Sequence, residues 1–348
     1  MPDPLNNETW RHLLGLESVD VVCEWHRKIR SLQLNNRRAV EITSSAKQAR
    51  EYFRNAANSA NTVRSLLTFY GIASLARSAL LLLKPRNGEE CLSRGHGLET
   101  VDWSKTLSGE LSGAIKAIRC LKIRSSAGLF NDFLMQTKNR ISMHVRSSAV
   151  DWRLTYALPP IGEELTLEAL LSTIPDLEKV LPVSAHNPSY ASVNEMTYSD
   201  ADGFLAKVRS KQFEAFRGSY ADLGYEVIQN GELSQIKCSS QTFGTSKPQF
   251  MHTYVNKMFD SIPTLHIVKP IQKDIRLSQL SITYALSYIL GMLTRYFPTQ
   301  WIALHSGTKG DGLWPTIHAA QNYVELAFPE LIIELIHDML AEGDKNPA

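Results

Sequence analysis

Cysteines, and the residue patterns that hold metals or nucleotides, are scarce in this sequence. It contains four cysteines in 348 residues, and their spacing fits neither a CxxC pair nor a zinc site. Its ten histidines are scattered without the spacing of metal ligands. Neither a GxxxxGKS/T loop nor a strand-linked GxGxxG loop is present. These absences predict reduced thiols, no bound metal and no cofactor.

A secretory signal is also missing, because the first 16 residues contain no basic stretch followed by an apolar one. One apolar segment, residues 62–83, has the length of a membrane span. Arg77 lies near its middle, beside Ser74 and Ser78, and a charged side chain at that depth is energetically costly. We therefore expect a buried core helix in a cytoplasmic protein that has no membrane contact.

Two long apolar segments, residues 62–83 and 280–301, dominate what is present. Each carries apolar residues at helical spacing and more apolar surface than its neighbouring sequence can cover. Because the segments lie near opposite ends of the chain, the simplest arrangement packs them against each other. Further helices are expected over residues 5–35, 34–54, 110–123, 165–181, 316–328 and 330–340.

The middle of the sequence has the alternation of β-strands. Residues 152–158 and 264–271 have strand patterns, and residues 225–237 form the clearest hairpin signal. Asn230 and Gly231 suit the positive-φ positions of a type I′ turn. We therefore predict an α+β, predominantly α-helical fold. A discontinuous helical body, residues 1–150 and 273–348, would enclose an inserted, mostly antiparallel α/β module at 151–272.

The amino-acid sequence in and near the two apolar segments resembles that of the YaaC-like protein family of bacteria. The similarity is concentrated in the helical parts and adds little over 151–272. It implies a cytoplasmic bacterial protein and assigns no catalytic residue. The matching residues are Tyr70, Gly71, Leu75, Ala76, Ser78, His96, Gly97, Leu98, Leu290, Met292, Leu293, Arg295, Tyr296, Pro298 and Trp301.

The first candidate site is the loop Ser93-Arg94-Gly95-His96-Gly97-Leu98. Glycines on both sides of His96 allow a close approach of the backbone to a ligand, and Arg94 could hold an anion. The alternative is a simple turn after a long helix, in which glycine serves the geometry of the chain.

Arg140 and His144 form a second candidate, because an i,i+4 pair lies on one face of a helix. Ribonucleases of the HEPN type use an Arg and a His for phosphate and ribose, respectively, although the spacing here is shorter than theirs. The alternative is a solvated basic face.

Two further cations are candidate anion ligands. Arg295 ends an apolar helix, where a buried guanidinium would need a carboxylate or a phosphate. Lys309 lies in a glycine-rich loop, which could hold a phosphate or serve only as a connector.

Charge is distributed unevenly along the chain. Residues 1–150 hold 22 Lys+Arg and 13 Asp+Glu, a net charge of +9, and the remainder has a net charge of −7. A basic half can bind a polyanion or its own acidic half. Lys116, Arg119 and Arg124 would supply the nucleic-acid contacts, on the polar face of a helix over 110–123.

Together these patterns predict a YaaC-like binding or interaction module that contacts an anionic partner through its basic N-terminal half. The partner could be a protein of a multi-component system or a nucleic acid. Two alternatives remain open: a HEPN-like ribonuclease, and a binder of a small phosphate-bearing ligand.

Overall fold

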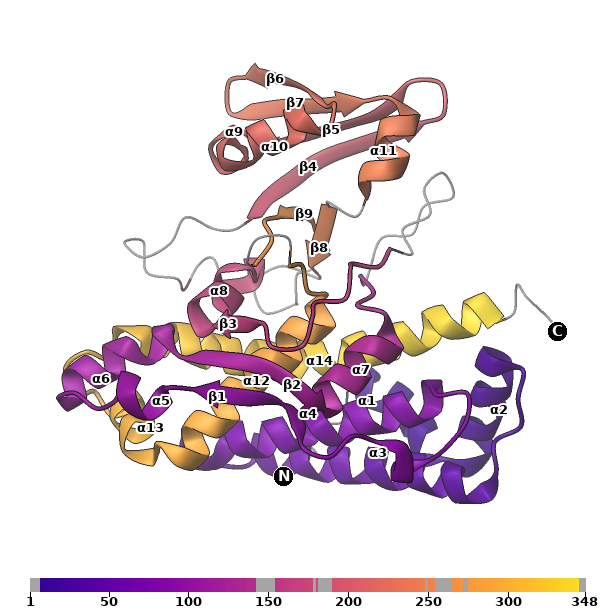
Figure 1. The fold of residues 1–348 in the computed structure, drawn as a ribbon, viewed down its shortest axis with the longest axis vertical. Helices are drawn as coiled ribbons and strands as arrows, with labels where there is room; N and C mark the ends of the chain where they lie inside the picture. Colours follow the sequence, from indigo (N-terminus) through magenta and orange to yellow (C-terminus); the bar gives the residue numbers. More distant parts are fainter. Residues whose placement is uncertain are drawn as a thin grey trace. The chain divides into compact units, whose positions relative to one another are not determined.

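The computed structural model describes residues 7–141, 154–177, 180, 190–247, 250–253, 264–271 and 275–343. The chain divides into two compact units. Unit 1 consists of Met1–Lys138, Leu158–Glu168 and Leu280–Ala348, and unit 2 consists of Asn139–Ala157 and Ala169–Gln279. Helices dominate unit 1 and antiparallel strands dominate unit 2 (Figure 1). The fold is α+β and predominantly α-helical, with two antiparallel sheets inserted among the helices.

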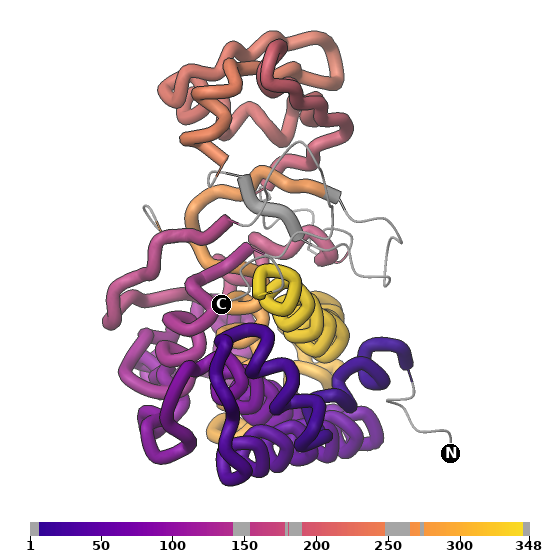
Figure 2. Tube along the Cα trace, turned by 90° about the vertical axis from the view of Figure 1, so that its right-hand side faces the viewer, coloured from indigo at the N-terminus to yellow at the C-terminus, as the bar shows by residue number. Residues whose placement is uncertain are grey.

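Unit 1 is built from long helices and a small antiparallel sheet of order β1-β2-β3. The C-terminal helix α14 lies beside the N-terminal helices, so both ends of the chain share one body (Figure 2). The elements are α1 (Glu8–Leu13), α2 (Val19–Arg30), α3 (Asn36–Ala57), α4 (Asn61–Leu83), β1 (His96–Val101), α5 (Trp103–Thr106), α6 (Leu111–Ala117), β2 (Lys122–Gly128), α7 (Leu129–Thr137), β3 (Glu164–Thr166), α12 (Gln279–Tyr296), α13 (Pro298–His305) and α14 (Trp314–Gly343).

Helix α4 is the core helix of this unit. It is long and apolar enough to cross a membrane, but 72% of that apolar window is buried inside the protein. Helix α12 packs directly on it, since a Cβ added at Gly291 would lie 2.7 Å from Cβ of Phe69. Leu290 is fully buried beside this contact. The predicted packing of the two apolar segments is confirmed.

The C-terminal end of α4 is capped by basic side chains. Arg38 donates to the carbonyl oxygens of Leu81 (3.1 Å) and Lys84 (2.8 Å), and His26 bonds that of Leu82 through Nδ1 at 2.9 Å. Both side chains are buried, and burial lowers the pKa of His26. Both side chains satisfy free carbonyl groups at the helix end, and the positive charge of Arg38 also interacts favourably with the negative end of the helix dipole.

Two predictions about the helices of unit 1 were wrong. The helix over 110–123 ends at Ala117, and strand β2 begins at Lys122, because Ile123 is buried between two exposed neighbours. The two helices expected on either side of Pro329 are one helix, α14. Phe328 and Pro329 are both buried, so packing holds the helix together across the missing N–H donor.

Unit 2 contains a six-stranded antiparallel sheet of order β6-β7-β5-β4-β9-β8. Its core is aromatic, and Phe204 and Phe243 stack with ring centroids 4.1 Å apart. The elements are α8 (Leu167–Ser172), β4 (Tyr190–Ser199), β5 (Gly203–Arg209), α9 (Ser210–Phe213), α10 (Arg217–Asp222), β6 (Glu226–Asn230), β7 (Leu233–Cys238), α11 (Ser240–Ser246), β8 (Phe250–Thr253) and β9 (Thr264–Val268).

The predicted hairpin is present as β6 and β7, but its turn is shifted by one residue. Asn230 pairs with Leu233, so the two loop residues are Gly231 and Glu232. Gly231 has a φ of 65° at the first loop position, where glycine is found in a type II′ turn. The type I′ turn centred on Asn230 and Gly231 was therefore wrong, although the hairpin and the positive φ of Gly231 are confirmed.

Candidate functional site

Polar and aromatic side chains gather around His96, where β1 begins against α4 and α12. The half-buried imidazole packs on the ring of Phe69 with centroids 4.9 Å apart. Tyr288 and Tyr70 lie on other sides of it, at 6.1 and 6.5 Å between centroids. Residues from two distant parts of the sequence therefore surround one histidine.

The glycines beside His96 have different roles. Gly97 has a φ of 78°, and a Cβ there would lie 2.6 Å from the backbone nitrogen of Phe130. Gly128 on β2 approaches Gly97 as closely, since its added Cβ would lie 2.3 Å from the nitrogen of Gly97. The turn explanation therefore accounts for Gly97, because the close approach is between segments of this chain. Gly95 has a φ of 85° and open space beside it.

Arg295 lies at the C-terminal end of α12, next to the same cluster. Its guanidinium is exposed and donates through Nη1 to the hydroxyl of Tyr70 at 2.8 Å. It also lies 5.0 Å from the ring centroid of Tyr296. The sequence suggested a buried guanidinium that needed a carboxylate or a phosphate. The structure instead shows an exposed one with a phenol as partner.

The electrostatics of the cluster favour a neutral His96 and a protonated Tyr288. Burial lowers the pKa of His96, and the positive charge of Arg295 lowers it further. Burial raises the pKa of Tyr288 to about 12, and Tyr296 and Glu99 add to this effect. At neutral pH the cluster therefore offers a neutral imidazole, a permanent cation and hydroxyl donors.

This combination can bind an anion and can move a proton. Arg295 keeps N–H groups beyond the one that it gives to Tyr70, and such groups bind phosphate oxygens. The ring nitrogens of His96 have no hydrogen-bond partner in the described residues, so one of them can accept a proton from a ligand. Across the described ranges, no group of three or more potential metal ligands is assembled.

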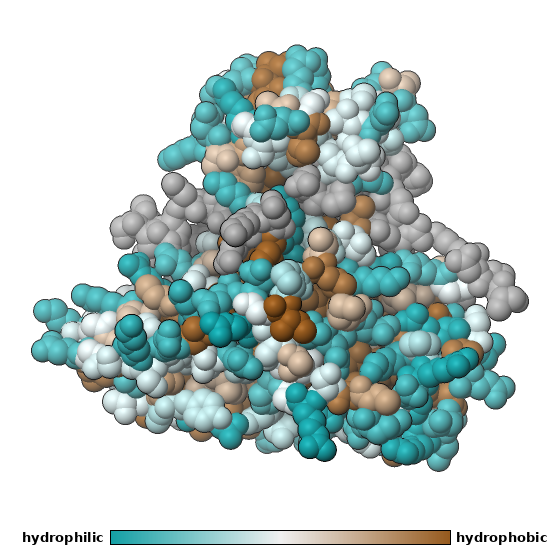
Figure 3. All heavy atoms as spheres, in the orientation of Figure 1, coloured by the Kyte–Doolittle hydropathy of each residue, from teal (hydrophilic) through white to brown (hydrophobic). Residues whose placement is uncertain are grey.

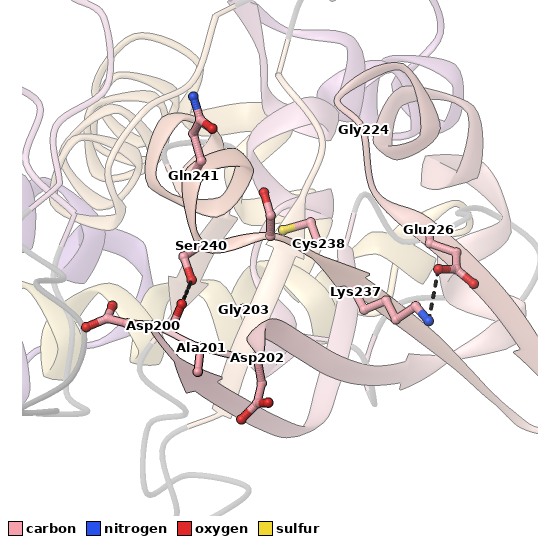
Figure 4. A pocket seen from close by; sticks show the side chains of 11 residues that line it. Asp200, Ala201, Asp202, Gly203, Gly224, Glu226, Lys237, Cys238, Ser240 and Gln241 are labelled. Atoms are coloured by element: carbon pink, nitrogen blue, oxygen red, sulfur yellow. Dashed lines mark hydrogen bonds and ion pairs between the residues drawn. The ribbon is translucent and has the colours of Figure 1, made fainter.

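A second candidate is a hollow at one end of the sheet in unit 2. It has a volume of about 640 Å³ and is formed by the turn between β4 and β5, the start of β6, the end of β7 and the start of α11 (Figure 4). Three carboxylates line it, from Asp200, Asp202 and Glu226. The hollow therefore does not favour an anion.

The charged groups of this hollow are already engaged. Lys237 pairs with Glu226 at 2.9 Å, and Asp200 accepts a hydrogen bond from the hydroxyl of Tyr198 at 2.9 Å. Burial raises the pKa of the Cys238 thiol, so it is no thiolate nucleophile at neutral pH. The hollow lacks the free cation and the neutral base that the His96 cluster has.

The other predicted anion ligands lie on the surface, and Arg94 is only two residues from His96 in the sequence. Arg94, Lys309, Lys116 and Arg119 are all exposed. Hydrophilic side chains cover much of the visible face, with small hydrophobic patches between them (Figure 3). A positive side chain is ordinary on such a surface and by itself marks no site.

Arg124 is exposed, but it is already paired. It lies on β2 and not on a helix, and its guanidinium bonds Glu164 of β3 at 2.5 Å. Lys122 approaches the same carboxylate at 3.6 Å. Arg124 is therefore a weaker candidate for a nucleic-acid contact than Lys116 or Arg119.

The Arg140 and His144 pair cannot be placed as a unit. Arg140 forms an isolated bridge with Thr155, and His144 lies outside the described residues. The strand expected over 152–158 also lies partly outside them.

Among the predicted site residues, the structure brings together His96 and Arg295. The sequence interpretation gave no role to Tyr288, or to Tyr70 and Tyr296 beyond their place in the resemblance. The sequence did contain a signal for Tyr288. Tyr288 and Arg295 lie seven residues apart and therefore share a helix face.

No curated protein and no solved structure matches this chain. A family model, that of the YaaC-like proteins, matches residues 23–336, which include the whole His96 and Arg295 cluster. The chain therefore belongs to the YaaC-like protein family.

Proposed function

We propose that this protein is a binding module for an anionic, phosphate-bearing ligand, which it holds at Arg295 and His96. The observation that carries the proposal is the state of Arg295. Its guanidinium is exposed and oriented by Tyr70, and it forms no salt bridge with any residue in the described part of the chain. A guanidinium held in this way keeps planar N–H groups for a phosphate.

The charge of the surrounding sequence supports the same proposal. Residues 1–150 have a net charge of +9, which attracts anionic partners over distances of about 10 Å at moderate salt. A nucleic acid or an acidic protein of a multi-component system would be attracted in this way. We place the protein in the cytoplasm without a membrane contact, because its cysteines are free and α4 is mostly buried.

Cleavage of RNA is the second candidate function, and one observation favours it. His96 is neutral and lies beside the positive charge of Arg295. A neutral imidazole could take the proton of a ribose 2′-hydroxyl, whose oxygen then attacks the adjacent phosphorus. The bond from phosphorus to the 5′-oxygen breaks, the 5′-oxygen receives a proton from solvent, and Arg295 balances the phosphate charge.

Titration calorimetry with inorganic pyrophosphate tests the binding proposal. Arg295→Gln should weaken pyrophosphate affinity about tenfold or more, since hydrogen bonds to charged groups contribute about 1.5–3 kcal/mol. Arg77→Gln is the matched control, because Arg77 is also an exposed arginine, 3.7 Å from Glu89. This substitution should change the pyrophosphate affinity little. Equal affinities of the wild type and Arg295→Gln, or no binding by the wild type, would contradict the proposal.

A labelled single-stranded RNA tests the second candidate. If cleavage occurs at this cluster, His96→Asn should abolish it and Arg140→Ala should leave it unchanged. Loss of cleavage in Arg140→Ala and His144→Ala would instead support the ribonuclease motif predicted from the sequence. If the wild type does not cleave the RNA, binding without cleavage is the proposal that stays.

A further inference from the structure

Tyr296 exposes an aromatic ring beside the guanidinium of Arg295. Its exposed fraction is 57%, and no other aromatic residue in the described part of the chain is as exposed. The aromatic neighbours Phe69 and Tyr288 are buried. A single exposed ring is ordinary on a protein surface, but this one lies beside a guanidinium that has no carboxylate partner in the described residues, so the two groups can contact one ligand.

The ring and the guanidinium form an ordered pair. The guanidinium lies 5.0 Å from the ring centroid of Tyr296 and also donates a hydrogen bond to the hydroxyl of Tyr70. Tyr70 in turn packs on Tyr52, with centroids 5.6 Å apart. This chain of contacts holds both groups before a ligand arrives, which lowers the entropy cost of binding.

The two groups recognise different parts of one kind of ligand. The free edge of a guanidinium binds phosphate oxygens, and an exposed aromatic ring stacks on a flat base. An aliphatic or purely anionic ligand would use only one of them. We propose that the ligand carries a nucleobase, which stacks on the pair formed by Arg295 and Tyr296 while its phosphate binds Arg295. This inference rests on the proposed anion site and names its ligand class.

The test compares three ligands by titration calorimetry: AMP, ribose 5-phosphate and a short single-stranded oligo(A) RNA. The wild type should bind AMP about tenfold or more tightly than ribose 5-phosphate, because only AMP has a base to stack. Tyr296→Ala should remove this preference, because it weakens the binding of AMP far more than that of ribose 5-phosphate. Tyr296→Phe should keep the preference, because it retains the ring.

Ile302→Ala is the matched control, since Ile302 is also exposed, at 44%, and lies on the neighbouring helix α13. It should bind all three ligands as the wild type does. Thermal unfolding of each variant checks that the fold is intact, and exposed substitutions rarely disturb it.

The outcomes separate this inference from the anion site. Equal affinity for AMP and ribose 5-phosphate, or a base preference that persists in Tyr296→Ala, would contradict the proposed nucleobase ligand. Neither result would contradict the proposed anion site. Failure of the wild type to bind any of the three would overturn both. A base preference that depends on Tyr296 supports the inference, and comparison of AMP with the RNA identifies a free nucleotide or a strand as the source.

Discussion

Two surface cations, one in each unit of this protein, have partners of different kinds. In unit 1, Arg295 has a phenol as its partner and stays exposed. In unit 2, Lys237 is paired with Glu226 in a hollow that two further carboxylates line. The hollow is concave, with a volume of about 640 Å³, but its lysine is paired with a carboxylate, whereas Arg295 of unit 1 is paired with none in the described residues. If Arg295 binds an anion as proposed, the partner of a cation is a better guide to anion binding than the depth of a surface.

The interiors of the units differ in a related way. Unit 1 buries Arg38 and His26, and both bond to carbonyl oxygens at the end of α4. Unit 2 buries His266 on β9, whose Nδ1 lies 3.4 Å from the hydroxyl of Ser192. Its Nε2 is buried without a hydrogen-bond partner. Burial lowers the pKa of both histidines, but His26 bonds a carbonyl oxygen of the helix end, whereas the pKa of His266 is lowered to about 4.

The largest effect is expected from Arg38→Met in unit 1. The substitution leaves the carbonyl oxygens of Leu81 and Lys84 without their donor in a buried setting. We expect a loss of about 3–5 kcal/mol in the free energy of unfolding, measured by denaturation with urea. Arg37→Met is the control, because Arg37 is the exposed neighbour and should matter far less. Equal losses in both variants would mean that the contacts at the helix end stabilise little.

Acid should destabilise unit 2 through His266. Burial lowers the pKa of His266 to about 4 in the folded protein, from an ordinary value of 6.5. Below pH 6.5, His266 binds a proton in the unfolded chain but not in the folded chain. The free energy of unfolding therefore falls until the pH reaches about 4. The loss should be about 3 kcal/mol, since one pKa unit corresponds to about 1.4 kcal/mol.

Hydrogen exchange of the β4 and β9 amides between pH 7 and 4 measures this effect, after correction for the intrinsic pH dependence of exchange. His266→Gln should flatten the change, because glutamine takes up no proton in this range. If His266→Gln loses protection against exchange as steeply as the wild type, other titratable groups cause the acid sensitivity.

The sequence predicted best where one pattern extended over many residues. The packing of α4 on α12 followed from two apolar segments that nothing nearby could cover. Short patterns were ambiguous, and residues 118–124 satisfied a helical period although Ile123 belongs to a strand. The hairpin was located correctly, but its register depended on Asn230 pairing with Leu233, which the preference for Asn-Gly turns does not determine.

The candidate site was found as separate residues and not as a cluster. His96 stood out between its glycines, and Arg295 stood out at the end of an apolar helix. Their closeness depends on which residues of α12 face α4 and β1, and a single sequence contains no record of that register. The pairing of Arg124 with Glu164 was hidden for the same reason, because it requires β2 and β3 to be neighbours.

A smaller effect is expected at the hairpin of unit 2. Gly231→Val places a β-branched residue at a φ of 65°, which should cost about 1–3 kcal/mol in the free energy of unfolding. Nothing lies within 4 Å of an added Cβ there, so backbone strain alone would account for the loss. Gly218→Ala on α10 is the control and should be neutral or slightly stabilising. An unchanged unfolding midpoint for Gly231→Val would show that the turn relaxes to another type.

The smallest effect on stability is expected from charge reversal on the exposed face of unit 1. Lys116→Glu with Arg119→Glu should change the free energy of unfolding by only about 0.5 kcal/mol, because both side chains are exposed. If unit 1 attracts polyanions, the same variant should weaken binding of single-stranded RNA and flatten its salt dependence, since fewer counterions are released. Arg124→Ala should weaken RNA binding less, because Glu164 already neutralises that guanidinium. Filter binding at several salt concentrations measures all three proteins. If the RNA affinity does not depend on salt and is unchanged in Lys116→Glu with Arg119→Glu, the basic surface takes no part in binding. Arg295 and His96 would then be the proposed anion site by themselves.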